Sequence, residues 1–264
     1  MKINYYQVDS FTKEPFFGNP AGVVILDKEA CEYWMGKVAE EMNLSETSFL
    51  YLISQNKYHL RWFTPTDEVD LCGHATLAAA HILWEKNFIE KTQNIIFETN
   101  SGELICQNNN NLIQMNFPQE EAFNTEPPKE LLQSLDVNIL YCGKNRFDYI
   151  VEVESEEILK QINPDFNLLK KINARGIIVT SKSTNNEYDF VSRFFAPNVG
   201  VNEDPVTGSA HCCLAPYWAK KMKKNKFKAL QVSARGGILF LELFKDRINI
   251  SGNAITVFEG KILM

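Results

Sequence analysis

The sequence predicts an α+β protein of two pseudo-symmetric halves, each a curled, mostly antiparallel sheet around one central helix. A unit of strand, proline, acidic loop, glycine and small-residue helix occurs twice, about half a chain apart. Such self-similarity is the signature of a repeated architecture. Both helices of the repeat are apolar or small on nearly every face, which is typical of helices that are buried on all sides. Strand-like segments flank each helix, so each helix is expected inside a sheet.

The repeat can be read directly in the sequence. Residues 61–65 read RWFTP and residues 193–197 read RFFAP, 132 positions later in a chain of 264 residues. An acidic loop follows each segment, and Gly73 and Gly208 then open the runs of small residues. Strand–loop–helix units are common in proteins with mixed structure, but the same order of features twice favours duplication.

Alternating apolar residues bounded by turn residues predict the strands. They cover residues 4–9, 21–26, 47–53, 58–63, 94–98, 103–107, 112–117, 138–141, 147–153, 176–180, 189–195, 229–233, 238–242, 248–251 and 255–258. The central helices are predicted at residues 74–84 and 209–218, and amphipathic outer helices at 29–42 and 156–162.

Prolines mark the boundary between the halves. Pro118, Pro127 and Pro128 interrupt regular structure in an acidic stretch. The halves are therefore predicted at residues 1–117 and 124–254, with a hinge at about 118–129.

Composition and charge restrict the classes of function. The net charge of −6 argues against nucleic acid as a partner, because phosphate binding usually needs a basic surface. No apolar run approaches the roughly 18 residues of a membrane-spanning helix, and the first residues lack the pattern of a signal peptide. The six cysteines lack the spacing of a disulfide framework. We therefore expect a cytoplasmic protein with reduced thiols and no membrane partner.

The two glycine-led helix starts form a candidate site for a small carboxylate. A helix N-terminus presents unpaired N–H groups and the positive end of the helix dipole. Gly73, Ala75 and Gly208 would offer backbone donors, and His74 and Ser209 would add side-chain donors. The alternative is that these helices begin after glycine for capping reasons alone.

Acid–base chemistry needs a positioned proton acceptor, and two acids are candidates. Asp204 precedes the second helix, and Glu46 lies between an outer helix and a strand. Either carboxylate could instead cap a helix or lie in a solvated turn. The pair Cys72 and His74 could act as nucleophile and base, although the spacing does not require their side chains to converge and no third, orienting residue is identifiable.

Metal and nucleotide sites have little support in the sequence. Cys212 and Cys213 are adjacent on a predicted helix and point about 100° apart, and no cysteine pair has zinc-ligand spacing. Glycine-rich phosphate-binding motifs are absent. The sequence therefore predicts neither a metal nor an organic cofactor.

Taken together, these motifs resemble the phenazine-biosynthesis PhzF-like family, which has the diaminopimelate epimerase-like fold. The resemblance is carried by residues 7–12 (QVDSFT), 17–24 (FGNPAGVV), 45–47 (SET), 61–65, 68–76 (EVDLCGHAT), 175–180 (RGIIVT), 203–210 (EDPVTGSA) and 257–260 (VFEG).

The resemblance implies two halves with an active site between them, no cofactor and a homodimer. It also implies that the final strand, within residues 255–264, completes the N-terminal half. Glu46 would be the general acid–base, with Gly73, His74, Asp204 and Ser209 binding substrate. Asn19 and Thr207 lie in the matching motifs and join the substrate-binding set: Gly73, Ala75, Gly208, Ser209, Asn19 and Thr207. The catalytic candidates are Glu46, Asp204 and His74.

Diaminopimelate epimerase uses two thiols, one at each helix start, and this sequence departs from that pattern. Asp204 is expected where the second thiol would be, and Cys72 lies near the first. The resemblance therefore implies an isomerase that shifts a hydrogen on one substrate face by acid–base proton transfer. A Cys72-dependent epimerase or racemase and a catalytically silent metabolite-binding protein remain the alternatives.

Overall fold

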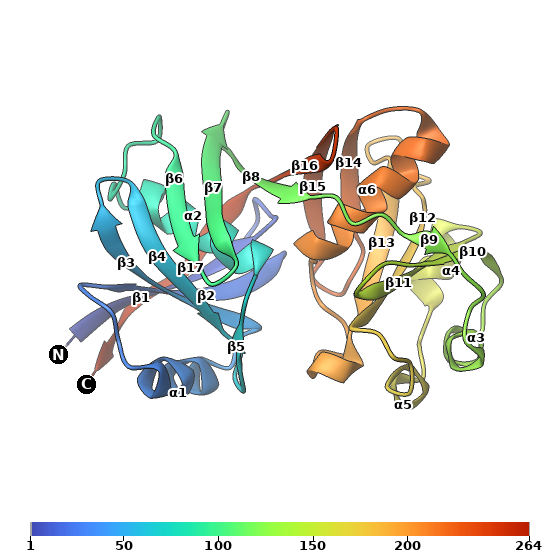
Figure 1. Ribbon diagram of the computed structural model, residues 1–264, viewed down its shortest axis with the longest axis horizontal. Helices are drawn as coiled ribbons and strands as arrows, with labels where there is room; N and C mark the ends of the chain where they lie inside the picture. Colours follow the sequence, from blue (N-terminus) through green and yellow to red (C-terminus); the bar gives the residue numbers. More distant parts are fainter. Residues whose placement is uncertain (1, 264) are drawn as a thin grey trace. The chain divides into compact units, whose positions relative to one another are not determined.

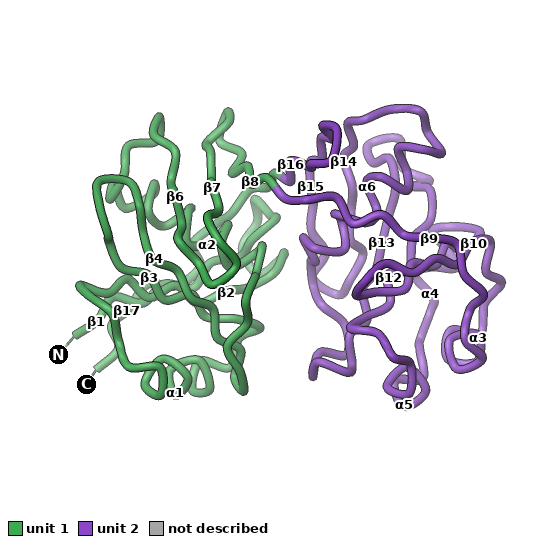
Figure 2. Tube along the Cα trace, in the orientation of Figure 1, with its two compact units in different colours: residues 1–116, 251–264 green, residues 117–250 purple. Residues whose placement is uncertain are grey.

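The computed structural model describes residues 2–263 of the chain. The chain forms two compact units (Figure 2): unit 1 consists of residues 1–116 and 251–264, and unit 2 of residues 117–250. Within the described residues, no helix is both long and apolar enough to cross a membrane.

Unit 1 is a sheet that surrounds one helix (Figure 1). Its helices are α1 (Glu32–Met42) and α2 (Gly73–Glu85). Its strands are β1 (Lys2–Ser10), β2 (Asn19–Leu26), β3 (Glu46–Ser54), β4 (Lys57–Phe63), β5 (Glu68–Val69), β6 (Ile95–Thr99), β7 (Gly102–Asn109), β8 (Leu112–Pro118) and β17 (Ala254–Leu263). Helix α2 contacts β1, β2, β3 and β17, and most of its residues are buried. It is therefore the central helix that the sequence predicts.

Unit 2 repeats this plan around another helix. Its helices are α3 (Lys129–Leu135), α4 (Glu156–Gln161), α5 (Phe166–Leu169), the 3-10 turn η1 (Pro197–Val199) and α6 (Gly208–Met222). Its strands are β9 (Phe123–Asn124), β10 (Ile139–Lys144), β11 (Asp148–Val153), β12 (Gly176–Lys182), β13 (Phe190–Phe195), β14 (Lys226–Gln231), β15 (Gly237–Phe244) and β16 (Arg247–Gly252). Helix α6 is buried along most of its length.

The order of strand pairing is the same in both units. In unit 1 the strands are paired in the order β17, β1, β2, β3, β4, β6, β7. Of these six pairings, β2 with β3 and β4 with β6 are parallel, and the other four are antiparallel. In unit 2 the order β9, β10, β11, β12, β13, β14, β15 has the same succession. The predicted fold class, with two pseudo-symmetric and mostly antiparallel halves, is confirmed.

A proline inside α6 is accommodated by a contact from outside the helix. Pro216 has no N–H to donate to the carbonyl of Cys212 four residues earlier. The backbone N–H of Glu120 donates to that carbonyl instead, at 3.0 Å. The freed acceptor is thereby satisfied, and α6 continues to Met222.

Every predicted strand and helix overlaps an observed one, but short elements were missed. The proline-rich stretch at 118–129 was expected to lack regular structure, yet it contains β9, which pairs with β10. Helix α3 has 7 residues and helix α5 has 4, which are too few to show the periodicity of apolar residues that indicates a helix. The change from unit 1 to unit 2 falls between residues 116 and 117.

Candidate functional site

The ends of three neighbouring strands place polar residues beside the start of α2. Asn19 opens β2 opposite Ser10, the last residue of β1. Glu46 opens β3 and lies opposite Ala21 of β2. Asn19 and Ser10 are completely buried, so this edge of the sheet carries polar groups that are shielded from water.

Side-chain hydroxyls hold the first turn of α2 against these strands. Ser10 Oγ donates to the carbonyl of His74 at 2.8 Å, and Ser48 Oγ donates to that of Ala75 at 3.0 Å. Thr76 Oγ1 donates to the carbonyl of Cys72 at 2.6 Å. Cys72 is the N-cap residue, but within the described chain its side chain makes no capping hydrogen bond. The first N–H groups of α2 are thus left without a side-chain cap.

Glu46, Cys72 and His74 form one cluster. His74 Nε2 lies 3.1 Å from Glu46 Oε2, and His74 Nδ1 lies 3.5 Å from Cys72 Sγ. The sequence did not require the Cys72 and His74 side chains to meet and showed no third residue to orient them. The structure brings the three together: the side chains of Cys72 and His74 converge, which the spacing had left open, and Glu46 of β3 is a third residue in contact with the imidazole.

The contact between Glu46 and His74 lacks hydrogen-bond geometry. Among the described residues, neither Glu46 Oε2 nor His74 Nε2 has a hydrogen-bond partner, although both atoms are buried. The His74 side chain is only 7% exposed and that of Glu46 19%. Buried polar atoms are nearly always hydrogen-bonded, and within the described residues the ion-pair contact at 3.1 Å is the interaction that these two atoms make.

The charges in this cluster follow from its burial. Burial disfavours the imidazolium form of His74, but Cys72 and Glu46 oppose this effect and raise the pKa of His74 well above its ordinary 6.5. Burial, reinforced by Glu46, raises the pKa of the Cys72 thiol to about 11. Burial thus favours the protonated thiol form of Cys72.

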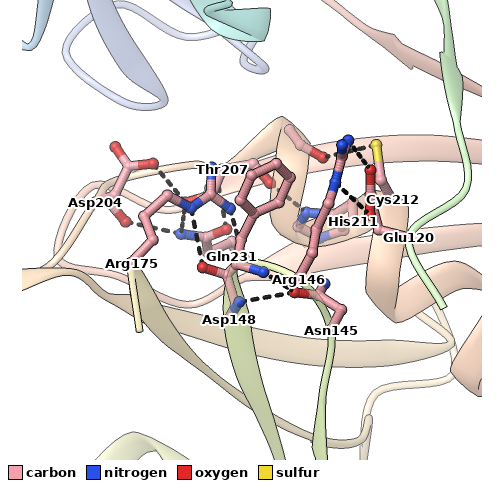
Figure 3. A network of polar contacts seen from close by, with 12 residues as sticks. Glu120, Asn145, Arg146, Asp148, Arg175, Asp204, Thr207, His211, Cys212 and Gln231 are labelled. Carbon is pink, nitrogen blue, oxygen red and sulfur yellow. Dashed lines mark hydrogen bonds and ion pairs between the residues drawn. The ribbon is translucent and has the colours of Figure 1, made fainter. Parts of the chain in front are cut away.

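In unit 2, Asp204 and Thr207 are tied together ahead of α6 (Figure 3). The Thr207 hydroxyl donates to Asp204 Oδ2. Gln231 of β14 donates through Nε2 to the carbonyl of Asp204 at 2.7 Å and accepts from the N–H of Thr207 at 2.9 Å. This one glutamine therefore fixes the loop that leads into α6.

A partly buried arginine, Arg175, and a buried aspartate, Asp148, form a pair beside this loop. Arg175 makes a bidentate contact with Asp148, with Nε to Oδ1 at 2.9 Å and Nη2 to Oδ2 at 2.5 Å. Burial opposes the charge on Arg175, but Asp148 and then Asp204 overcome this and raise the pKa of Arg175. Figure 3 shows Arg175 beside Asp204. Asp204 thus lies in the field of a fixed cation.

The residue of unit 2 that corresponds to Cys72 is Thr207, not Asp204. Both are N-cap residues in extended conformation directly before the helical glycine. The residue four positions later donates to the N-cap carbonyl in both units: Thr76 to Cys72, and His211 Nδ1 to Thr207 at 2.8 Å. The expectation that Asp204 takes the place of a second thiol was therefore wrong. Asp204 lies three residues earlier in the loop.

The predicted site residues fall into one group in each unit. Asn19, Glu46, Gly73, His74 and Ala75 lie together in unit 1. The group in unit 2 consists of Asp204, Thr207, Gly208 and Ser209. Sequence reasoning missed Gln231, because a residue on a later strand gives no local sign of its contact with this loop. The catalytic and binding roles of both groups stay predictions.

Comparisons with known proteins agree on one family. The family model described as phenazine biosynthesis-like protein, PhzC-PhzF, matches residues 8–260. An uncharacterized isomerase of Halalkalibacterium halodurans is 54% identical over 265 aligned residues, which cover 100% of both chains. The crystal structure of a PhzF family protein from Enterococcus faecalis has a TM-score of 0.95 at 38% identity and covers 100% of both chains.

A putative PhzC/PhzF protein from Clostridium difficile has a TM-score of 0.92 at 42% identity, covering 99% of this chain and 100% of that one. The matches extend over both units, so the similarity includes both groups of candidate residues. The relatives that carry the name isomerase support an isomerase-like function. This chain belongs to the PhzC-PhzF family of phenazine biosynthesis-like proteins.

Proposed function

We propose that the protein is a cofactor-independent isomerase that shifts a hydrogen within a small carboxylate-bearing metabolite, with Glu46 as the acid–base group. The observation that carries the proposal is the contact between Glu46 Oε2 and His74 Nε2 at 3.1 Å, in which both buried atoms lack a hydrogen-bond partner among the described residues. A substrate oxygen would supply the missing partner, and Glu46 would then face the reacting carbon.

The substrate carboxylate would bind at the start of α2. The Cys72 side chain makes no N-cap hydrogen bond to α2 among the described residues, and the imidazolium of His74 adds a positive charge. A helix N-terminus and a neighbouring cation together favour an anion. Asn19 would bind another polar group of the substrate. Asp204, Thr207, Gly208 and Ser209 are the proposed substrate-contacting residues of unit 2.

The residues at the two helix starts favour a hydrogen shift over two-base epimerisation. Cys72 has Thr207 as its counterpart, and a threonine hydroxyl is too weak an acid to replace a thiol. A single carboxylate can remove a proton from an activated carbon and return it to another atom on the same face.

The Glu46→Gln variant tests the proposal. Glutamine keeps the size of the side chain but cannot accept the substrate proton. Deuterium incorporation from heavy water would be followed by NMR over a panel of small carboxylates that carry an acidic C–H bond. We expect exchange in the wild type and a rate lower by about 10²- to 10⁴-fold in the variant, the usual contribution of a positioned acid or base. Affinity for a bound carboxylate should change by less than about tenfold, ~1.4 kcal/mol.

The matched control is Glu29→Gln, which removes an exposed glutamate of the same unit and should leave exchange unchanged. Exchange by Glu46→Gln at the wild-type rate would refute the role of Glu46. Binding of a carboxylate by the wild type with no exchange in any substrate of the panel would instead favour a silent binding protein.

The contact of Cys72 with His74 gives a second candidate, a Cys72-dependent epimerase or racemase. With its pKa raised to about 11, Cys72 is a poor base at neutral pH. We therefore predict that Cys72→Ala keeps at least about a third of the wild-type exchange rate, because no proton passes through the thiol. A loss of several orders of magnitude in a folded variant would establish the thiol as the base.

A further inference from the structure

The cluster of Glu46, Cys72 and His74 contains a carboxylate, a thiol and an imidazole, which are three of the common ligands of zinc. One donor atom from each residue lies within 4.8 Å of the other two. We propose that this cluster is a binding site for a thiophilic divalent cation, Zn²⁺ or Cd²⁺, which enters from solution and occupies the place of the substrate.

The spacing of the donor atoms is close to that of a tetrahedral site. With zinc bonds of about 2.0–2.1 Å to nitrogen and oxygen and about 2.3 Å to sulfur, neighbouring ligands lie about 3.3–3.6 Å apart. Glu46 Oε2 and His74 Nε2 are 3.1 Å apart, close to one edge of that tetrahedron. Cys72 must turn toward the same ring nitrogen, because its present contact is with Nδ1. All three donors already lie within 4.8 Å of one another, and the Cys72 side chain has to move to complete the site.

An independent observation indicates that the cluster is built to receive a further group. His74 Nε2 and Glu46 Oε2 are buried without a hydrogen-bond partner among residues 2–263, and the His74 side chain is more than nine-tenths buried. The cluster is fixed from both sides, because Ser10 donates to the carbonyl of His74 and Thr76 to that of Cys72. The main chain that carries two of the three donors is therefore held before any ion binds.

The donor set selects the type of ion. Thiolate and imidazole favour Zn²⁺ and Cd²⁺, whereas Mg²⁺ and Ca²⁺ prefer oxygen ligands. Binding replaces the thiol proton of Cys72, which leaves to solvent, by a bond from sulfur to the metal. Three protein ligands leave a fourth position for water. The bound ion would occupy Glu46 and His74, so it would block the reaction that we propose for them. Metal binding itself does not depend on that reaction.

Cadmium titration tests the site without any measurement of turnover. A thiolate bound to Cd²⁺ produces an ultraviolet charge-transfer band. Cys31 is the only exposed cysteine among the described residues, so the titration would use the full-length Cys31→Ser protein. We expect one ion per chain with the band of a single thiolate, and displacement of Cd²⁺ by Zn²⁺ but not by Mg²⁺.

Variants then identify the ligands. In the Cys31→Ser protein, Cys72→Ser should abolish the band, and Glu46→Gln and His74→Gln should each weaken binding by about tenfold or more. Glu29→Gln should have no effect. Circular dichroism would verify that each variant folds. If His74→Gln does not fold, the affinity of Glu46→Gln alone decides the test. Absence of the band, its persistence in Cys72→Ser, or unchanged affinity in Glu46→Gln would overturn the proposal. None of these results bears on proton exchange by Glu46.

Discussion

At the scale of single residues, the two buried histidines near the helix starts have opposite charge preferences. His74 lies beside Cys72 and Glu46, which together raise its pKa against the effect of burial. His211 is fully buried in unit 2, where burial lowers its pKa to about 4 although Nδ1 contacts the Thr207 carbonyl. One position therefore favours imidazolium and the other neutral imidazole.

The lowered pKa of His211 predicts a loss of stability in mild acid. Below about pH 6.5 the unfolded chain takes up a proton on this histidine, whereas the folded protein does not until about pH 4. The free energy of unfolding should therefore fall as pH drops from 6.5 to 4, by up to about 3 kcal/mol from this group. Urea denaturation at several pH values should show a smaller fall in His211→Gln.

His74 does not obscure this measurement. Because its folded pKa is raised, its stabilising contribution is complete below about pH 6.5 and is lost as pH rises through the folded pKa. The two histidines therefore act in different pH ranges. Identical acid dependence in the wild type and His211→Gln would show that His211 is not the group that titrates.

At the scale of elements, the two units share a contact between an arginine and a glutamate. In each unit the arginine lies on the strand before the central helix, and the glutamate lies between that strand and the helix. Arg61 of β4 binds both oxygens of Glu68 at 2.6 Å. Arg193 of β13 binds both oxygens of Glu203 at 2.7 and 2.9 Å. Arg193 Nη1 also donates to the carbonyls of Ile162 at 2.6 Å and Leu159 at 3.2 Å. The repeated sequence thus produces the same arginine–glutamate contact, here called the clasp, in both units. In unit 2 the arginine of the clasp also binds two backbone carbonyls.

This difference predicts unequal effects of the same substitution. Lysine cannot form the bidentate contact, so Arg61→Lys should lower the free energy of unfolding by about 1 kcal/mol. Arg193→Lys should cost about 3 kcal/mol, because it also leaves partly buried carbonyls without a donor. Paired urea titrations would compare the variants. A larger effect at Arg61 would refute the additional role of Arg193.

The sequence predicted the elements better than the contacts between them. Alternation and the all-apolar helices were sufficient for the longer strands and for α2 and α6, because those signals are local. The pairing of Glu46 with His74 depends on how β3 lies beside β2 and on where α2 starts, and no local pattern encodes this. The clasp was visible as repeated arginines and glutamates, but their geometry required the fold. Thr207 could have been matched to Cys72 by counting back from the two glycines.

At the scale of the molecule, the two ends of the chain meet in one unit. Strand β17 pairs with β1 along its length, from Lys2 opposite Leu263 to Ser10 opposite Ala254 (Figure 1). Strand β1 also pairs with β2 and contributes buried residues such as Tyr5 and Val8. The C-terminal strand therefore protects one side of a strand on which the core of unit 1 depends.

Removal of residues 254–264 should consequently destabilise unit 1 selectively. The backbone groups of β1 that face β17 would lose their partners, and unpaired buried backbone groups are costly. Hydrogen exchange followed by mass spectrometry should show loss of protection in β1 and β2, with β11 and β12 of unit 2 little affected. Full protection of β1 in the truncated chain would contradict this dependence.

Unit 1 is built from two separate segments of the chain. This constrains the order in which the two units can fold during synthesis on the ribosome. Residues 117–250 form unit 2 as one uninterrupted stretch, so this unit does not need a segment from a later part of the chain. The earlier-made residues 1–116 must wait for the segment from 251 onward. Since domains commonly fold as units during synthesis, beginning at the N-terminus, this chain reverses the usual succession. Residues 1–116 are completed only after residues 117–250 have been made, and nascent β1 remains open to chaperones or to a neighbouring chain until β17 has emerged to pair with it.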